Sequence, residues 1–527
     1  MNKKYTENRT PETAVRTATL SVLKETGRDR KGLPAIVGGL LLICYCSWEF
    51  GPVLRHLAEE NYFSFDKLPL NYLWRQPLGG LYWAGRFLTL PFLNQWIGGF
   101  YLAALLTLSA YFTDKALNLS CRWKGVGFVP AALLLCWASW RGYNLYLRNE
   151  PSLLIIGAWL LLIVSGVAAA VRGVFGRKDF ATECPHIWTR WGLWVAVAAL
   201  GGVMTYTYTC RQNVILSCDM QNKMMDADWE GMVDDALAAR QPDRSVAAYH
   251  AIALNHTGQL LEHVFDIDYN YPTVKLDSIG GMDEGVNYIT ECNLHCGLVL
   301  PAYHYAMEQN VMGGPRLRYF KLLALSSLLN GEKELCERYL HLIDKMPFQD
   351  NFTRPLREMM EESAKLVNDP TMARILQFLP REHKFEQNFR TPPFLGYNVG
   401  VLSGTDETLN TSVAAALYSK DMENIIMRAQ YLQQKRTLPL SVQQALVIAS
   451  FKRPGLLKNF PNISDFVQNE VINFAQQAAP LSKDKSDEGK KTMRDALVND
   501  WKGSYMFYYY CGNLNQTAQK KTETAVN

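Results

Sequence analysis

Two cysteines and a histidine that lie close together are the first residues whose types suggest chemistry. Cys292 and Cys296 flank His295, and zinc is commonly bound by Cys and His side chains. A zinc site needs about four such ligands, and no second Cys/His pair accompanies this one. We therefore expect the three side chains to pack in a helical core. The chain also lacks the G-x-S-x-G, P-loop, H-E-x-x-H and dinucleotide-binding signatures, so we predict no catalytic, cofactor-binding or metal-binding residue.

A second polar group begins at the outer end of the first long apolar stretch and continues through the loop that follows it. It contains four carboxylates and two guanidinium groups: Glu49, Glu59, Glu60, Asp66, Arg75 and Arg86. The simplest interpretation is that these are ordinary loop charges at a membrane interface. In outline the loop is also similar to the first outer loop of multi-pass glycosyltransferases that use lipid-linked sugars. That resemblance implies an acidic residue that activates the acceptor hydroxyl and arginines that bind the lipid phosphate in a bidentate manner. The chain lacks the paired-Asp motif of those enzymes and has fewer apolar stretches than they have spans, so we favour a non-enzymatic protein.

The residues that flank this loop are predicted to cross a membrane. A span takes about 20 mostly apolar residues. Five stretches qualify, at residues 34–54, 92–112, 125–147, 151–171 and 190–209, which defines a transmembrane domain at residues 33–210. The stretch Leu78–Leu90 is shorter and contains Arg86, so we expect an interfacial or re-entrant helix there. A full crossing at this point would make six spans.

The basic residues of the short loops predict the orientation. Residues 1–32 and the loops 113–124 and 172–190 carry 15 Lys and Arg together, against six in the opposite loops. The more basic side of a membrane protein is usually cytoplasmic. The basic N-terminus is then cytoplasmic, and everything after Thr209 is extracytoplasmic, which in a bacterial inner-membrane protein would be the periplasm.

This orientation predicts the state of the cysteines, because disulfides persist in oxidising compartments. Cys121 and Cys184 lie in the cytoplasmic loops and should be reduced, as should Cys44, Cys46 and Cys136 within the spans. Disulfides are permitted among six cysteines outside: Cys210, Cys218, Cys292, Cys296, Cys336 and Cys511.

The region at residues 211–512 is predicted to be helical. Residues 211–527 have a net charge of −5, which gives them no reason to bind nucleic acid. Apolar residues recur at helical spacing, as at Val442, Ala445, Leu446 and Ala449. The aromatic run Trp501–Tyr510 is expected to be a last helix that docks on the core, and the polar tail at residues 513–527 is expected to be disordered.

An internal repeat runs through part of this region. Gly297 is followed five residues later by Ala302, and Gly331 by Cys336, with 34 residues between the two pairs. This pattern resembles the tetratricopeptide repeat, a 34-residue helix–turn–helix, over about Gly285 to Phe348. Gly258 and Lys420 mark degenerate copies. An unrelated α-helical array is the alternative.

The resemblance implies a solenoid whose first helices line a concave groove for a peptide or protein partner. Arg316, Arg318 and Lys321 could line that groove and meet an acidic partner, or could lie on a solvated helix face.

The complete layout resembles an uncharacterised family of bacterial multi-pass inner-membrane proteins with a tetratricopeptide-like C-terminal region. The residues that carry this resemblance are Glu49-Phe50, the run Leu78-Gly79-Gly80-Leu81-Tyr82 and the segment from Trp229 to Gly258. The fold class expected is all-α, with five spans followed by a helical-repeat solenoid. The function expected is membrane-anchored presentation of a protein-interaction surface in the cell envelope, without a cofactor. The partners expected are the lipid bilayer and an extracytoplasmic protein or peptide. A membrane transferase that acts on a lipid-linked substrate is the alternative.

Overall fold

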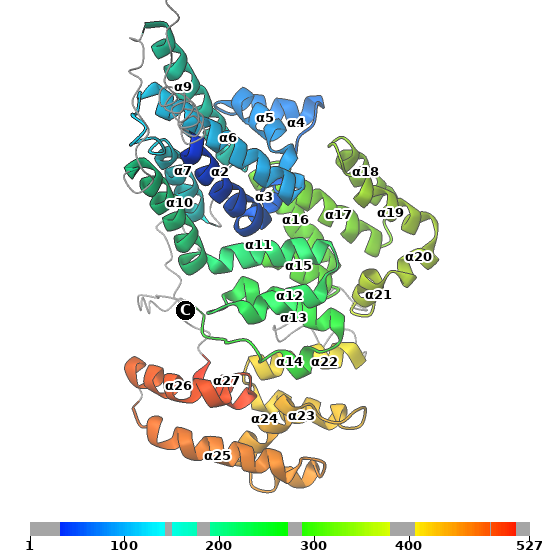
Figure 1. Cartoon of the computed structure of the whole chain (residues 1–527). Helices are drawn as coiled ribbons and strands as arrows, with labels where there is room; N and C mark the ends of the chain where they lie inside the picture. The colour runs from blue at the N-terminus through cyan, green and yellow to red at the C-terminus, as the bar shows by residue number, and fades with distance from the viewer. Residues whose placement is uncertain are drawn as a thin grey trace, which may run out of the picture. The chain divides into compact units, whose positions relative to one another are not determined.

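The computed structural model describes residues 32–142, 150–175, 190–271, 287–379, 406–484 and 486–512 (Figure 1). Every regular element within these ranges is helical and no β-strand occurs, so the all-α prediction is confirmed for them. The chain divides into two compact units. The first unit comprises Met1–Arg55, Pro91–Arg141 and Ser152–Arg211, and the second comprises His56–Leu90, Gly142–Pro151 and Gln212–Asn527. The predicted tail at residues 513–527 and nearly all of the basic N-terminus lie outside the described residues.

The first unit contains the predicted spans. Its elements are α2 (Leu33–Cys44), the π-helix η2 (Tyr45–Glu49), the start of α3 (Gly51–Glu59), α6 (Gln95–Ala116), α7 (Phe128–Arg141), α9 (Leu153–Phe175) and α10 (Trp191–Cys210). Helix α6 packs against α2, α7 and α9, and α10 packs against α2 and α7. Three buried hydroxyl groups hold η2, α7 and α10 together: Tyr45 Oη lies 3.0 Å from both Ser139 Oγ and Thr207 Oγ1, which lie 2.9 Å apart.

The prediction of five spans is wrong in number. Within the described residues three helices are long and apolar enough to cross a membrane, namely α6, α9 and α10. A fourth is obtained only if Leu33–Glu49 and Gly51–Glu59, which meet at a bend of 58°, count as one broken span. Helix α7 is a shorter apolar helix of 14 residues, so it falls short of the predicted span at residues 125–147.

Local backbone chemistry explains these differences. The predicted span at residues 34–54 breaks where the π-helix meets Gly51-Pro52, because proline lacks an N–H and its ring clashes with the preceding turn. The predicted span at residues 92–112 begins later, since Asn94 caps α6 by accepting hydrogen bonds from the backbone N–H groups of Trp96 and Ile97. Hydropathy averages over such boundaries and therefore does not reveal them.

The cysteines depart from the prediction at one position. Cys121 is disulfide-bonded, so the expectation of a reduced thiol in the loop 113–124 is wrong for this residue. Cys184 lies outside the described residues. The six cysteines at which disulfides were permitted are all free thiols: Cys210, Cys218, Cys292, Cys296, Cys336 and Cys511.

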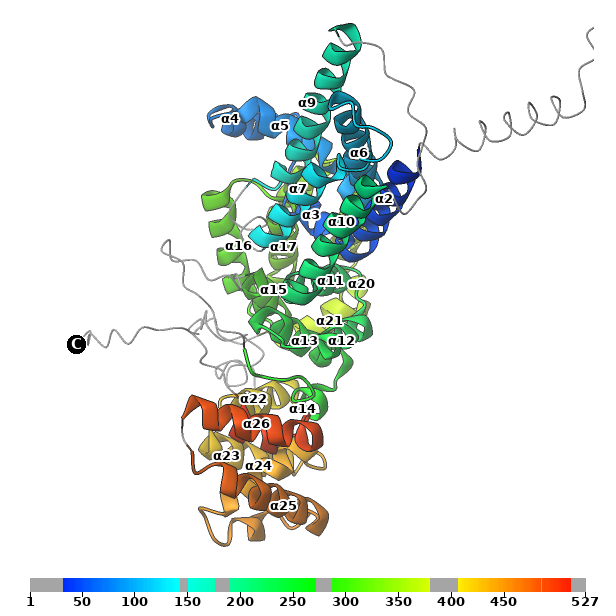
Figure 2. The same ribbon diagram turned by 60° about the vertical axis from the view of Figure 1, so that its left-hand side comes forward.

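The second unit begins with two short helices and continues as a long succession of helices (Figure 2). The short helices are α4 (Lys67–Trp74) and α5 (Gly79–Leu88). The succession comprises α11 (Gln212–Met225), α12 (Trp229–Ala238), α13 (Arg244–Thr257), α14 (Leu260–His263), α15 (Asn287–His295), α16 (Val299–Gly313), α17 (Leu317–Leu329), α18 (Lys333–Asp344), α19 (Asp350–Glu361), α20 (Ser363–Asn368), α21 (Pro370–Leu376), α22 (Asp406–Tyr418), α23 (Met422–Leu432), α24 (Leu440–Ser450), α25 (Asp465–Leu481), α26 (Asp487–Trp501) and α27 (Tyr505–Cys511).

Five of the turns between consecutive helices have the same hydrogen-bond geometry. The turn residues are in the left-handed region, with φ between 55° and 80°: Ala227, Gly258, Gly297, Gly331 and Lys420. Each turn residue donates its N–H to the carbonyl three residues earlier, and the next residue donates to the carbonyl five residues before itself. This double closure is the Schellman motif, which ends a helix at a left-handed residue. Gly297 and Gly331 are the predicted repeat glycines, Gly258 and Lys420 were predicted to mark degenerate copies, and Ala227 was not anticipated.

The repeat pattern also predicts a small residue five positions after the turn glycine, where the second helix approaches the first. Ala302 and Cys336 are fully buried on α16 and α18, as the pattern predicts. Gly297 is also constrained by a close neighbour, because a Cβ atom there would lie 2.4 Å from the backbone carbonyl of Phe378.

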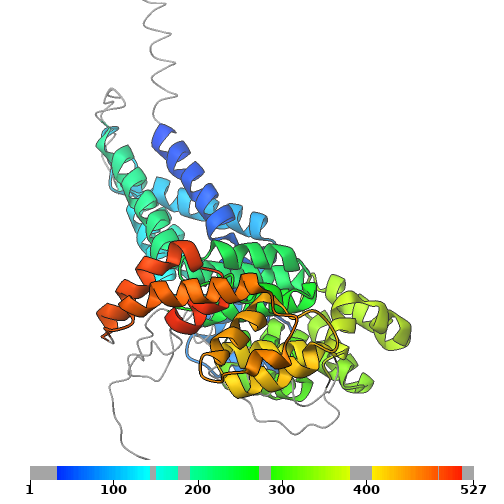
Figure 3. The same ribbon diagram turned by 90° about the horizontal axis from the view of Figure 1, so that it is seen from below.

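The C-terminal helix docks on the core, as its aromatic sequence predicts (Figure 3). Helix α27 packs against α24 and α26, and Tyr505 and Phe507 are buried. The ring of Tyr508 packs against Tyr269 and lies 6.1 Å from that of Tyr418, stacked on it. Aromatic burial therefore closes the end of the second unit.

Close helix packing in the first unit predicts a sensitive glycine. A side chain at Gly99 on α6 would meet the Cα and Oγ atoms of Ser47 at 2.5 Å, whereas Gly201 on α10 has nothing within 4 Å. Gly99→Leu should therefore destabilise the purified full-length protein by about 1–3 kcal/mol or more, as overpacking does. Gly201→Leu is the matched control and should leave the melting temperature in detergent nearly unchanged. Equal melting temperatures for the two variants would contradict this packing.

Candidate functional site: a buried ion-pair cluster

The charged residues of the first loop and of α17 meet in the second unit. After α3 ends at Glu59, residues 61–66 have no regular secondary structure. Arg316 precedes α17, and Arg318 and Lys321 lie on it. We call the following set the ion-pair cluster: Glu59, Glu60, Glu291, Arg316, Arg318 and Lys321. None of the six exposes more than 8% of its surface.

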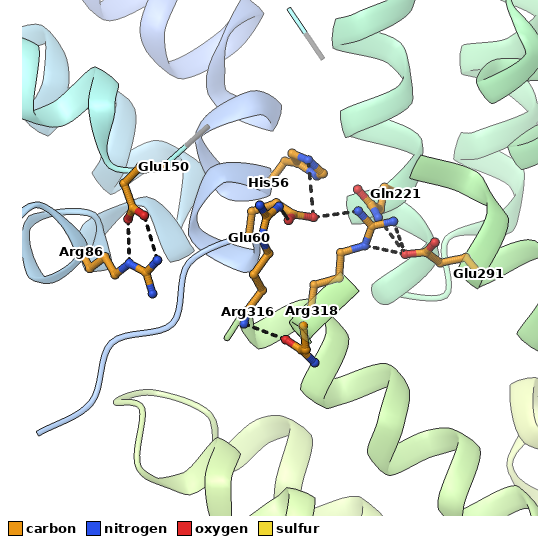
Figure 4. A network of polar contacts seen from close by, with 9 residues as sticks. His56, Glu60, Arg86, Glu150, Gln221, Glu291, Arg316 and Arg318 are labelled. Atoms are coloured by element: carbon orange, nitrogen blue, oxygen red, sulfur yellow. Dashed lines mark hydrogen bonds and ion pairs between the residues drawn. The ribbon is translucent and has the colours of Figure 1, made fainter. Parts of the chain in front are cut away.

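Glu60 is the centre of the ion-pair cluster (Figure 4). Its two carboxylate oxygens accept hydrogen bonds from different arginines, Oε2 from Arg316 Nη1 at 2.5 Å and Oε1 from Arg318 Nη1 at 2.7 Å. Arg318 donates a further bond from Nε to Glu291 Oε1 at 2.6 Å, and Gln221 Nε2 donates to the same oxygen at 2.9 Å. Arg318 on α17 therefore bridges an acid of the first loop and an acid of α15.

The neighbouring loop residues are fixed to the same helices. Glu59 accepts hydrogen bonds from Lys321 Nζ at 2.8 and 2.9 Å through its two oxygens. The Asn61 carbonyl accepts from the Leu317 N–H at 3.1 Å, and Tyr62 Oη donates to the Leu342 carbonyl of α18 at 2.8 Å. Further along, Asp66 forms an ion pair with Lys345. The segment from Glu59 to Asp66 is therefore bound through both its side chains and its backbone, as an extended peptide is bound in a peptide-binding groove.

A second ion pair fixes the end of this loop. Arg86 on α5 donates to both carboxylate oxygens of Glu150, from Nε at 2.6 Å and from Nη2 at 2.8 Å. The Arg86 carbonyl accepts from Asn61 Nδ2 at 2.9 Å, and Arg86 Nη1 donates to the Tyr62 carbonyl at 3.3 Å. Planar bidentate pairs of this kind are among the stronger ionic hydrogen bonds. Here the acceptor is a carboxylate of the chain itself rather than a lipid phosphate.

The ion-pair cluster is electrically balanced, with three carboxylates facing three cations. Burial by itself would raise the pKa of Glu60, but the Arg316 and Arg318 guanidiniums outweigh it and lower that pKa to about 2. Burial would likewise lower the pKa of Arg316, but Glu60 outweighs this effect and raises it. Both groups therefore stay charged at neutral pH.

This arrangement is suited to holding a segment and unsuited to proton transfer. A general base works best with a pKa near the operating pH and with access to the proton that it removes. Glu60 has neither, and Glu59 is buried against Lys321. Of the other loop residues named from the sequence, Arg75 is exposed, and Glu49 belongs to the first unit.

The sequence indicated most residues of the ion-pair cluster, but the acids of the first loop and the cations at α17 were predicted to belong to different sites. The acids were expected at an interface and the three cations either in a groove or on a solvated face, whereas the cations are buried against those acids. Glu291, Gln221 and Glu150 were not predicted. The one available signal was Glu291, an acid beside Cys292 in a helix expected to pack in a core.

The expected packing of the Cys-x-x-His-Cys group is confirmed. Cys292 and Cys296 are buried free thiols, and His295 Nδ1 lies 2.8 Å from His256 Nε2. The His256 ring stacks on Trp229 with centroids 3.8 Å apart. Within the described part of the chain, no group of three or more His, Cys, Asp or Glu side chains is arranged to hold a metal ion.

Removing one partner from the ion-pair cluster should be costly. Arg318→Ala leaves Glu60 and Glu291 with an uncompensated buried charge, for which a loss of about 3–5 kcal/mol is expected. Arg357→Ala is the matched control, because Arg357 also pairs with two carboxylates, Glu337 and Asp344, but lies at the surface. Its loss should cost less than about 1 kcal/mol. Thermal unfolding of the two full-length variants in detergent measures the difference, and similar melting temperatures would show that the cluster does not stabilise the second unit.

Comparison with known proteins adds a family but no activity. No curated protein and no solved structure matches the chain. A family model described as "Family of unknown function (DUF6057)" matches at residues 30–164 and again at residues 138–512. These matches cover both units and include the whole ion-pair cluster. The chain therefore belongs to this family of unknown function, DUF6057.

Proposed function

We propose that this protein is a membrane-anchored interaction module of the bacterial inner membrane. In this proposal, the apolar helices of the first unit anchor the chain, and the second unit is a tetratricopeptide-like solenoid that presents a binding surface in the periplasm. The observation that carries the proposal is the recurrence of one Schellman turn at five helix–helix connections of the second unit. Stacked helix pairs of this kind build an extended surface from repeated units.

The packing between helices supports a solenoid. The helices that precede the turns contact one another in series, α11 with α13, α13 with α15, and α15 with α17. Each of the following helices α12 and α16 also contacts the first helix of the next pair. These contacts are the ones expected of helix pairs that stack in order. Helix α14 additionally contacts α22 and α24, and α15 contacts α21, so the later helices fold back onto the earlier pairs.

Polar contacts that link three first helices support this proposal. Gln221 of α11, Glu291 of α15 and Arg318 of α17 take part in one network around Glu60. Because the chain's own segment from Glu59 to Asp66 already occupies α17 and α18, we place the external partner elsewhere, on the C-terminal helix pairs. Exposed apolar side chains there include Met427 and Tyr431 on α23, at 49% and 60% exposure, and Phe466 on α25, at 73%.

The transferase alternative gains no support from the site. Glu59 and Glu60, two of the acids suggested for hydroxyl activation, are neutralised by buried cations. Arg86, one of the arginines suggested for phosphate binding, is saturated by Glu150. We therefore develop only the interaction module.

Two observations bear on the sidedness in opposite directions. The excess of Lys and Arg in residues 1–32 and in loops 113–124 and 172–190 supports a cytoplasmic N-terminus and a periplasmic second unit. The disulfide at Cys121 counts against a cytoplasmic position for the loop 113–124, because disulfides are rare in that compartment.

Reporter fusions test the orientation. Alkaline phosphatase, active only outside the cytoplasm, is fused after Asn527 and, in a second strain, after Asn118. The proposal expects activity at Asn527 and none at Asn118. Activity at Asn118 with none at Asn527 would invert the orientation and refute the periplasmic assignment.

Site-specific photocrosslinking in living cells tests the partner surface. A photoreactive amino acid at Tyr431 or Phe466 of the full chain should give a discrete protein adduct of increased mass. Glu334, exposed on α18, is the control position and should give none. Charge substitution at Met427 should remove the adduct formed at Tyr431. Failure of both Tyr431 and Phe466 to give an adduct in cells that contain the folded protein would refute this partner surface.

A further inference from the structure

The two short helices α4 and α5 form a hairpin with many exposed apolar side chains. We define the apolar hairpin as residues 65–88. Its large exposed apolar side chains are Phe65 (73%), Tyr72 (36%), Trp74 (61%), Leu78 (66%), Leu81 (39%) and Phe87 (52%). Six large exposed apolar side chains on two short helices and their flanks are a concentration of the kind that marks an interaction site.

The exposed rings belong to a packed cluster and are therefore held in place. Phe63 and Trp83 lie beneath, and the ring of Phe65 lies 5.1 Å from that of Phe63 and 5.9 Å from that of Trp83. The ring of Phe87 lies 5.3 Å from that of Phe63. The polar side of the hairpin is anchored through the bidentate pair between Arg86 and Glu150. The exposure therefore does not come from a poorly packed segment.

The tip of the hairpin carries an unusual residue. Leu78 has a φ of 63° in the turn between α4 and α5, where glycine or asparagine would fit without strain. A leucine that is two-thirds exposed at such a position is costly both for the backbone and for contact with water. An apolar partner that buried the Leu78 side chain would remove the second of these two free-energy costs. We therefore expect Leu78 to contact an apolar environment.

The charges of the hairpin identify that environment. Residues 67–88 contain no Asp or Glu. Of the three basic residues, Arg86 is buried, whereas Lys67 and Arg75 are exposed beside the apolar side chains. Aromatic and aliphatic side chains with nearby cations are typical of elements that lie in the headgroup region of a bilayer and attract anionic lipids.

The covalent connection places a membrane within reach. Only six residues separate Leu88, the end of α5, from Gln95, the start of α6, and α6 is one of the three helices able to span a membrane. A connection of that length extends at most roughly 25 Å. Helix α5 has 10 residues, too few to cross the hydrocarbon by itself.

We propose that the apolar hairpin is an interfacial element that inserts Phe65, Trp74, Leu78 and Phe87 among the lipids, with Lys67 and Arg75 at anionic headgroups. This inference rests on the proposed membrane anchoring. The binding partner of the apolar hairpin is then the lipid surface, and the hairpin attaches the second unit to the bilayer.

Photocrosslinking in lipid nanodiscs tests the inference. The full-length protein carries benzoyl-phenylalanine at Phe65, Trp74 or Leu78, in nanodiscs of phosphatidylethanolamine and phosphatidylglycerol. Each position should give lipid adducts detectable by mass spectrometry. Phe466 is the matched negative control, because it is also a phenylalanine of the second unit with 73% exposure. Protein adducts at the hairpin in place of lipid adducts, or equal lipid labelling at Phe466, would overturn the proposal.

A third position separates the inference from the anchoring on which it rests. Ile163 on α9 is 53% exposed and should give lipid adducts if this helix spans the membrane. Lipid adducts at Ile163 with none at the three hairpin positions would refute the hairpin alone, whereas their absence at Ile163 would refute the anchoring. Lys67→Glu combined with Arg75→Glu should lower the lipid-adduct yield at Trp74 severalfold and leave the yield at Ile163 unchanged. An unchanged yield at Trp74 would refute the headgroup contact.

Discussion

The second unit depends on the pairing of Glu60 with Arg316 and Arg318. Moving one of these charges out of water costs several kcal/mol, and only a well-placed opposite charge offsets that cost. Each of the six buried charges of the ion-pair cluster has such a partner. The pairs that involve Glu59 and Glu60 join residues more than 250 positions apart in sequence, so they make the first loop a structural part of the second unit.

This constraint limits which surfaces of the second unit are open to a partner. A groove formed by first helices would ordinarily be open to a partner. In this chain the segment from Glu59 to Asp66 contacts α17 and α18 through carboxylates, a backbone carbonyl and a tyrosine hydroxyl, as a bound peptide would. The cations at Arg316, Arg318 and Lys321 are therefore unavailable to another acidic chain while this segment remains in place.

Most features that depend on residues close together in the sequence were predicted correctly, whereas features that depend on distant residues were not. Helical class, the glycine turns and the docking of Trp501–Tyr510 were predictable, because each depends on neighbours within a few residues along the chain. The number of spans was overestimated, since the break at Gly51-Pro52 and the short α7 are matters of backbone geometry that hydropathy does not record. The ion-pair cluster was not predictable, because no local signal says which acid meets which arginine.

The sequence by itself determined that the chain is helical and where several of its helices end, because a left-handed turn residue and helical apolar spacing act over one or two turns of helix. Only the tertiary structure determined which charged side chains are buried and which partners they have. Glu60 and Arg318 look like solvated residues when read along the chain, and folding buries both. Burial makes their Coulomb interaction strong, and burial is a property of the packed unit that neither segment has by itself.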